Sequence, residues 1–100
     1  MSGIKGDQID EVYRKGRKFR SPYFTLFYLP HREGLHVSPV VSKKIAKKAV
    51  VRNLIKRRLR HLGRLYFSDG KIVVVAKRDL SGVEFQKLEE EFKKIVTKID

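Results

Sequence analysis

The segment Ala49–Phe67 reads AVVRNLIKRRLRHLGRLYF, and its spacing determines how the whole chain is expected to fold. At about 100° per residue, its side chains separate onto two faces of a helix. The apolar face holds Val51, Leu54, Ile55, Leu59, Leu62, Leu65 and Tyr66. The opposite face holds Arg52, Asn53, Lys56, Arg57, Arg60 and Arg64. The spacing therefore predicts a helix over Lys48–Tyr66 that packs on a core and carries a basic stripe.

This helix lies within a longer stretch that has no acidic residue. Between Glu33 and Asp69 the chain has ten Lys and Arg and no Asp or Glu, and the formal net charge over all 100 residues is +13. Such uniform positive charge needs a polyanion to offset its self-repulsion, and nucleic acid is the usual one. An anionic membrane surface is the weaker alternative, because the apolar face of the helix is needed for the core.

Composition limits the other possibilities. One hundred residues, of which 41% are hydrophobic, suit one folded domain over residues 1–100 rather than a disordered chain, with Met1–Gly6 expected to be frayed. The chain has no Cys, which excludes disulfides and thiolate chemistry. No apolar run approaches the roughly 18 residues that span a bilayer, and the N-terminus lacks the apolar region of a signal peptide. A cytoplasmic protein is expected.

Patterns on both sides of the basic helix predict the rest of the fold. The expected elements are a helix over Asp7–Lys15, strands over Tyr23–Leu29, Leu35–Ser42 and Lys71–Lys77, and a last helix opened by the capping box Ser81–Glu84. Pro39 removes a backbone donor, so its strand should lie at an edge or carry a bulge. The run Ile72–Ala76 is continuously apolar, as in a strand buried on both faces. This order of elements predicts an α+β fold, an α/β sandwich in which helices flank one mixed sheet.

A second signal comes from a distinctive block at the start of the basic helix. The block comprises Val41-Ser42-Lys43-Lys44, Ala49-Val50-Val51-Arg52-Asn53, Ile55-Lys56-Arg57 and Leu59-Arg60. It resembles the protein subunits of bacterial ribonuclease P, whose hallmark is an arginine-asparagine-arginine helix after a strand that ends in Ser-Lys-Lys. The segments Val12–Gly16, Ser21–Phe24 and Ile72–Lys77 also fit that family's first helix and two of its strands. Leu54 stands at the third position of the hallmark triplet, where the family has arginine.

The resemblance implies a role in a ribonucleoprotein endonuclease that removes the 5′ leader of precursor tRNA. In that family the RNA subunit is the catalyst and uses Mg²⁺, while the protein binds that RNA and the leader and lowers the demand for metal. The resemblance also implies a four-stranded sheet with a left-handed crossover near the basic helix. One protein per ribonuclease P RNA is expected, with no metal held tightly by the protein alone.

Two sets of binding residues are predicted. The first, for the RNA subunit, consists of Lys43, Lys44, Lys48, Arg52, Asn53, Lys56, Arg57, Arg60 and Arg64, since arginine pairs with phosphate in a bidentate way. The second, which the resemblance assigns to the precursor-tRNA leader, consists of Ile9, Tyr13, Arg17, Lys18, Arg20 and Phe27. Aromatic side chains hold unpaired bases by stacking. The resemblance implies that the leader lies in a cleft between the first helix and the sheet. Phe24 and Phe27 point to opposite faces of their strand, so only one of them can line that cleft. Matching the family from Gly16 assigns Phe27 to the cleft and leaves Phe24 in the core.

The sequence offers no catalytic set of its own. The three His residues (His31, His36 and His61) have no spacing typical of a metal site or a nucleophile, and no Gly-rich phosphate loop is present. The main alternative to a ribonuclease P subunit is a ribosomal or assembly RNA-binding protein without a catalytic role. Duplex-DNA binding ranks lower, because strands rather than a helix-turn-helix partner precede the basic helix.

Overall fold

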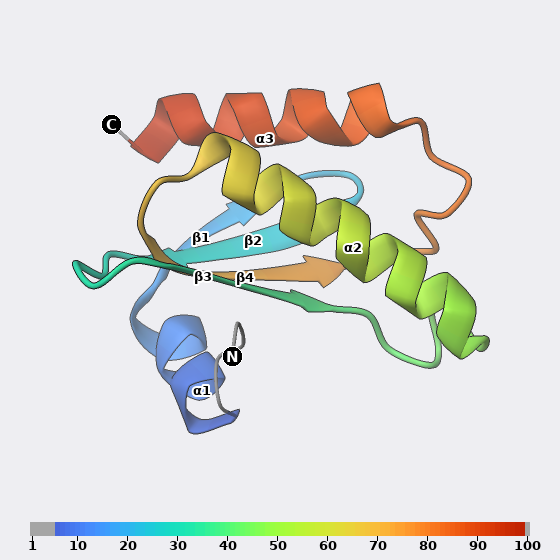
Figure 1. Cartoon of the computed structure of the whole chain (residues 1–100), viewed down its shortest axis with the longest axis horizontal. Helices are drawn as coiled ribbons and strands as arrows, with labels where there is room; N and C mark the ends of the chain where they lie inside the picture. The colour runs from blue at the N-terminus through green and yellow to red at the C-terminus, as the bar shows by residue number, and fades with distance from the viewer. Residues whose placement is uncertain (1–5, 100) are drawn as a thin grey trace.

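The computed structural model describes residues 6–99, which form helices packed on a mixed sheet (Figure 1). In chain order the elements are α1 (Gly6–Lys15), β1 (Arg17–Arg20), β2 (Phe24–Leu29), β3 (Leu35–Val40), α2 (Ala49–Tyr66), β4 (Gly70–Ala76) and α3 (Phe85–Ile99). The predicted α+β class and the order of the elements are confirmed. Residues 1–6 were expected to be frayed. Residues 1–5 lie outside the described residues, and Gly6 begins α1.

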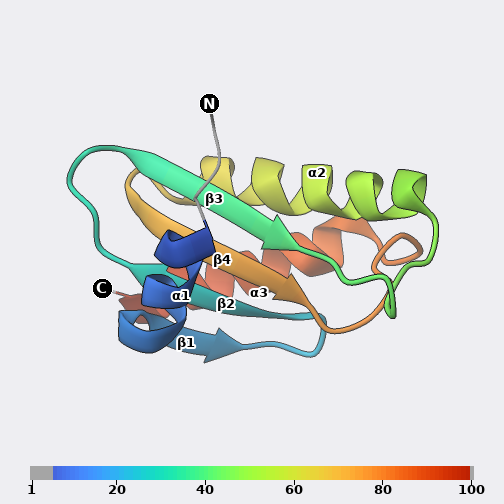
Figure 2. The same ribbon diagram turned by 90° about the horizontal axis from the view of Figure 1, so that it is seen from below.

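The sheet has four strands in the order β1-β2-β4-β3. β2 pairs antiparallel with β1 and β4, and β3 pairs parallel with β4. In Figure 2 these two parallel strands run side by side with α1 nearer the viewer and α2 on the far side of the sheet. The path from β3 through α2 to β4 is therefore left-handed, against the usual right-handed rule. The crossover that the resemblance implied is present.

Strand positions agree with the sequence patterns. Pro39 lies in β3, which pairs only with β4 and forms one edge of the sheet, where the missing donor is tolerated. β4 is central, and Ile72, Val73 and Val74 are fully buried, as a strand covered on both faces requires. Both predictions are confirmed.

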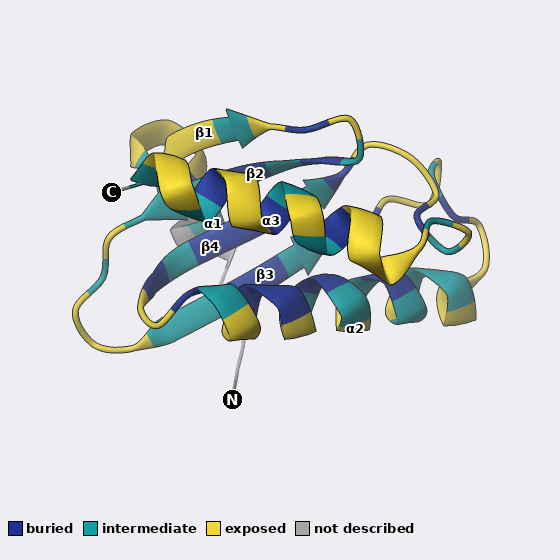
Figure 3. Ribbon diagram, turned by 90° about the horizontal axis from the view of Figure 1, so that it is seen from above, coloured by how far each residue is buried: buried dark blue, intermediate teal, exposed yellow. Residues whose placement is uncertain are grey.

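The main core lies between the sheet and the two long helices, α2 and α3, which cover the same face (Figures 1 and 3). The fully buried side chains include Phe24 and Leu26 from β2, Ile55, Leu59 and Leu62 from α2, and Leu88 and Phe92 from α3. α2 approaches β3 closely at Gly63, where an added Cβ would lie 2.8 Å from Cγ1 of Val37. Leu65 was expected on the apolar face of α2 but is 56% exposed, because it lies near the end of the helix and points away from the core.

Two local features differ from the sequence predictions. β1 was not predicted from the residues, because its sequence RKFR has a single apolar side chain. The prediction of a capping box at Ser81 is wrong, since α3 begins at Phe85. The Ser81 hydroxyl donates instead to Oδ1 of Asp79 at 2.6 Å, and the Ser81 N–H donates to the same oxygen at 2.9 Å. A local side-chain turn has replaced the expected cap.

Candidate nucleic-acid interface

The basic stripe of α2 and the connection before it carry charge that the described residues do not neutralise. Within residues 9–99, whose side chains the structure describes, ion pairs join Lys15 and Lys71 to Glu11, and Lys94 to Glu91. None of these pairs involves a cation between residues 43 and 64. Of the predicted RNA-binding residues, the exposed ones are Lys43, Lys44, Lys48, Asn53, Arg57 and Arg64, and the half-buried ones are Arg52, Lys56 and Arg60. In the described part of the chain no helix is both long and apolar enough to cross a membrane.

Two arginines of α2 are held by protein contacts as well. Nη1 of Arg52 donates hydrogen bonds to the carbonyl oxygens of Ala46 (2.9 Å) and Lys47 (2.8 Å). Arg58, which the helical spacing places among the apolar side chains of α2, donates through Nη1 to the carbonyl oxygen of Ser81 at 3.3 Å. Both arginines bind carbonyl oxygens that lie outside α2, so helical periodicity could not predict these contacts. Arg58 stabilises the loop before α3 and points away from the basic stripe.

The connection from β3 to α2 has a folded shape of its own. The N–H groups of Ile45 and Ala46 both donate to the carbonyl oxygen of Ser42 at 3.1 Å, which forms a turn with Lys43 and Lys44 exposed on it. Ala46 is buried and anchors the connection to the core. Lys48 is the N-cap of α2 and makes no side-chain capping bond. The turn therefore presents two lysines beside the start of the basic helix.

On the other face of the sheet, α1 and β2 form an aromatic cleft. The rings of Tyr13 and Phe27 meet edge to face with their centroids 4.8 Å apart. They line a cavity of about 350 Å³ together with Lys18, Thr25 and Val75. Nζ of Lys18 lies 5.7 Å from the Phe27 ring centroid. Partial burial, and secondarily the negative charge of Asp10, raises the pKa of the Tyr13 hydroxyl above its ordinary value.

The structure brings together only part of the predicted leader-binding set. In register, Lys18 lies opposite Phe27 and Arg20 opposite Thr25, so both basic side chains share the cleft face. Arg17 points to the other face, where its guanidinium lies over the Phe19 ring and donates to carbonyl oxygens at the end of α3. Ile9 is half-buried on α1 and is not among the residues that line the cavity.

Thr25 and Val75 also line the cavity, and neither was predicted as a binding residue. Strand alternation offered a signal for Thr25, because it shares a face with Phe27. Val75 could be assigned only once the pairing of β2 with β4 placed it opposite Thr25.

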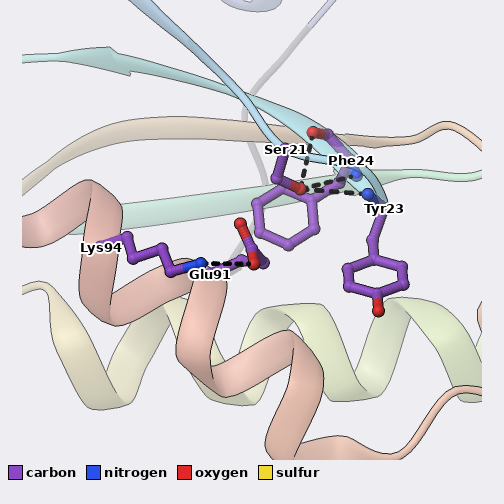
Figure 4. A network of polar contacts seen from close by, with 5 residues as sticks. All are labelled: Ser21, Tyr23, Phe24, Glu91 and Lys94. Carbon is purple, nitrogen blue, oxygen red and sulfur yellow. Dashed lines mark hydrogen bonds and ion pairs between the residues drawn. The ribbon is translucent and has the colours of Figure 1, made fainter.

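A buried serine, Ser21, holds the start of β2 through hydrogen bonds to Tyr23 and Phe24 (Figure 4). The Ser21 hydroxyl donates to the Phe24 carbonyl oxygen and accepts from the Tyr23 and Phe24 N–H groups, all at 3.1–3.2 Å. Phe24 then packs in the core against Phe92, with ring centroids 4.9 Å apart, and Phe27 points into the cleft. The assignment of Phe24 to the core and Phe27 to the cleft is confirmed as a placement.

The histidines do not form a reactive centre within residues 9–99. The rings of His31 and His36 lie 5.3 Å apart, and His61 lies 6.0 Å from the ring of Phe85. In that part of the chain no three His, Cys, Asp or Glu side chains are placed to hold a metal ion. The arrangement as a whole suits binding of a phosphate backbone and of unpaired bases.

Comparison with known proteins agrees with this arrangement. The model of the family described as Ribonuclease P matches residues 4–100. The chain is 42% identical over 95 residues to the ribonuclease P protein component of a Nitratiruptor species, covering 92% of this chain and 85% of that protein. In an alignment of 114 positions it is 32% identical to the ribonuclease P protein component of Rickettsia canadensis, covering 98% of this chain and 97% of that protein.

Solved structures show the same fold. The RNase P protein from Thermotoga maritima superposes with a TM-score of 0.80 at 22% identity, over 100% of this chain and 99% of that one. The RNase P protein of Staphylococcus aureus gives a TM-score of 0.79 at 23% identity, over 99% and 94%. The family match and the identity to its members decide the assignment: this chain belongs to the ribonuclease P protein family.

Proposed function

We propose that this chain is the protein subunit of a bacterial-type ribonuclease P that matures the 5′ end of tRNA in the cytoplasm. It binds the catalytic RNA subunit, one protein per RNA, and holds the 5′ leader of precursor tRNA while the RNA cleaves. Membership of the family supports the proposal. The observation that carries it is the aromatic cleft of Tyr13 and Phe27, with Lys18 on the same face, in a protein that also has an unneutralised basic helix.

The RNA subunit is proposed to contact the connection and α2. Flexible Lys43 and Lys44 reach phosphates from the turn, while Asn53, Lys56 and Arg57 follow one side of the helix. Nε of Arg60 is buried and has no hydrogen-bond partner in the described residues, so this arginine would meet RNA through its terminal nitrogens. Phosphate contacts of this kind position the protein without reading sequence, as a structured RNA partner requires.

The leader is proposed to lie in the aromatic cleft. Base–aromatic stacking is worth roughly 1–3 kcal/mol per base and tolerates any sequence, because every base has a π face. Lys18 and Arg20 lie beside the cleft on the same face and would bind the leader phosphates. A sequence-tolerant site suits a protein whose substrates share a tRNA body and differ in their leaders.

The chemistry itself is proposed to belong to the RNA and its Mg²⁺. No three carboxylate or histidine side chains come together within the described residues, and this supports a proposal in which the RNA binds the Mg²⁺. Basic side chains at the RNA surface instead offset phosphate charge. That effect is how the protein would lower the Mg²⁺ concentration at which the RNA folds and binds its substrate.

The first experiment is cleavage of precursor tRNA by a bacterial ribonuclease P RNA at low Mg²⁺, with and without this protein. Restored 5′ cleavage is expected, and its loss on combined replacement of Lys43, Lys44 and Lys56 by Ala would locate the RNA-binding surface. A protein that binds RNA in a salt-sensitive way but gives no stimulation would contradict the proposal and favour a general RNA-binding role.

The cleft makes a separate prediction. Phe27→Ala should weaken binding of precursor tRNA to the holoenzyme by roughly 5- to 150-fold, equivalent to losing about 1–3 kcal/mol of stacking. Affinity for mature tRNA, which has no leader, should not change. Phe19→Ala is the matched control, since Phe19 is also half-buried but lies on the opposite face of the sheet. Equal losses for precursor and mature tRNA would place the leader elsewhere.

A further inference from the structure

The position of Arg52 sets it apart from the other cations of α2. It lies one turn into the helix, yet its guanidinium turns back toward the chain before the helix. Nη1 donates to the carbonyl oxygens of Ala46 and Lys47 at 2.9 and 2.8 Å, the last two residues before the N-cap Lys48. Both distances are in the range of strong charge-assisted hydrogen bonds. Arg52 is half-buried, as are Lys56 and Arg60, so its two bonds to the connection distinguish it and its burial does not.

These two bonds matter because little else holds this part of the connection. Lys48 makes no side-chain capping bond, and the first turn of α2 has no acidic residue. The turn itself relies on the two N–H groups that donate to Ser42, on burial of Ala46 and on packing of Ile45 against the core. The guanidinium thus fixes the second half of the connection, while the Ser42 carbonyl fixes the first. Between these two anchors lie Lys43 and Lys44.

We infer that Arg52 is a positioning residue: it orders the connection so that Lys43 and Lys44 present their charges to the RNA, and it is not itself a main phosphate contact. This inference rests on the proposed function for its RNA partner. It reassigns one member of the predicted RNA-binding set, since a guanidinium shared by two carbonyls has fewer donors left for phosphate. If the connection were not already ordered, Lys43 and Lys44 would lose more conformational entropy when they bind RNA.

Two measurements test the inference, and the first contains no RNA. In the free protein, hydrogen exchange of the Ile45 and Ala46 amides reports whether the turn is formed. Arg52→Ala should speed exchange at both amides by roughly 10-fold, and Lys56→Ala, which removes one charge from the same stripe, should not. Unchanged exchange in Arg52→Ala would overturn the inference. Circular dichroism confirms that each variant is folded.

The second measurement is a double-mutant cycle on affinity for the ribonuclease P RNA. Arg52→Ala should weaken binding by about 10-fold in the wild-type background but by less than about 2-fold once Lys43 and Lys44 are both Ala. Its effect on the dependence of log affinity on log salt should match that of the double lysine variant, whereas Lys56→Ala should lower this slope by about 1. An equal loss in both backgrounds would show that Arg52 contacts phosphate directly and would overturn the inference.

Arg52→Lys provides a variant that keeps the charge if Arg52→Ala does not fold. A direct phosphate contact would accept an ammonium, because lysine also binds phosphate as a point charge. A positioning role predicts that the shorter lysine fails to hold both carbonyls, with faster exchange in the turn and weaker RNA binding. Full affinity in Arg52→Lys, with fast exchange, would overturn the inference. If the wild-type protein binds no ribonuclease P RNA, the proposed function fails, and the exchange measurement still decides whether Arg52 orders the connection.

Discussion

The two faces of the sheet use the same residue types in opposite ways. On one face, Phe24 packs against Phe92 with ring centroids 4.9 Å apart, and both side chains are fully buried. On the other, Phe27 meets Tyr13 at nearly the same separation, 4.8 Å, but Tyr13 is 39% exposed and the pair borders a cavity. The aromatic contacts are alike in distance, and the difference lies in what covers them.

Helix length accounts for this difference. The closed face is covered by α2 with 18 residues and α3 with 15, which lie side by side on that face (Figure 3). Among residues 6–99, the open face is covered only by α1, with 10 residues. Apolar rings left uncovered lose the stabilisation that full burial would give, and such patches usually mark a binding site. The comparison teaches that one strand can contribute to the core with one face and leave its other face open as a candidate binding surface, when helices cover the two faces unequally.

The largest expected effect separates the two phenylalanines by stability. Phe24→Ala removes a fully buried ring and should lower the free energy of unfolding by about 3–5 kcal/mol, a large part of the stability of a small domain. Phe27→Ala opens space that is already accessible to solvent and should lower it by about 1 kcal/mol or less. Urea unfolding followed by circular dichroism measures both. Equal losses would mean that the cleft belongs to the core and that the two faces do not differ in this way.

A middle-sized effect tests how tightly the closed face is packed. Gly63→Ala would place a Cβ 2.8 Å from Cγ1 of Val37 and 3.0 Å from Cγ2, and the β-branched valine has little freedom to move aside. The free energy of unfolding should fall by about 1–3 kcal/mol. Gly82→Ala is the matched control, because nothing lies within 4 Å of the added Cβ. A neutral Gly63→Ala would show that α2 can shift on β3, and the closed face would then be looser than its burial indicates.

Much of this arrangement follows from spacing in the sequence. The helical period of α2 predicted its buried side chains at Ile55, Leu59 and Leu62, because burial of an amphipathic face depends on local repetition. Alternation in β2 separated Phe24 from Phe27 for the same reason. Pro39 predicted an edge strand through its missing donor. These signals are local, and the structure confirms each placement.

Other features depend on partners that spacing cannot identify. β1 pairs with β2 although its cations give no strand pattern, and that pairing is what sends Lys18 to the cleft and Arg17 to the end of α3. The carbonyls that Arg52 binds are available only because the connection folds back on α2. The handedness of the crossover came from the resemblance alone. Register and long-range contacts are set by the whole fold, so a single sequence does not reveal them.

The smallest expected effect compares a tyrosine from each face. On the closed face, the Tyr66 hydroxyl donates to Oε2 of Glu89 at 2.7 Å, and this bond, with some burial, raises the pKa of Tyr66 above its ordinary value. At Tyr13 the pKa is raised chiefly by burial. In both cases the folded state favours the protonated phenol, so the stabilisation is present below about pH 10 and is lost as the pH rises beyond it.

Glu89→Ala distinguishes the two causes. The pKa of Tyr66 should fall toward about 10, because the acceptor and its negative charge are gone, while the pKa of Tyr13 stays raised. Titration of the tyrosine rings by NMR follows each group separately. The alkaline loss of stability that Tyr66 contributes should shrink in the variant, and the contribution of Tyr13 should remain. If the Tyr66 titration did not move, burial would be the cause on both faces, and the chemical distinction between them would fail even where the packing distinction holds.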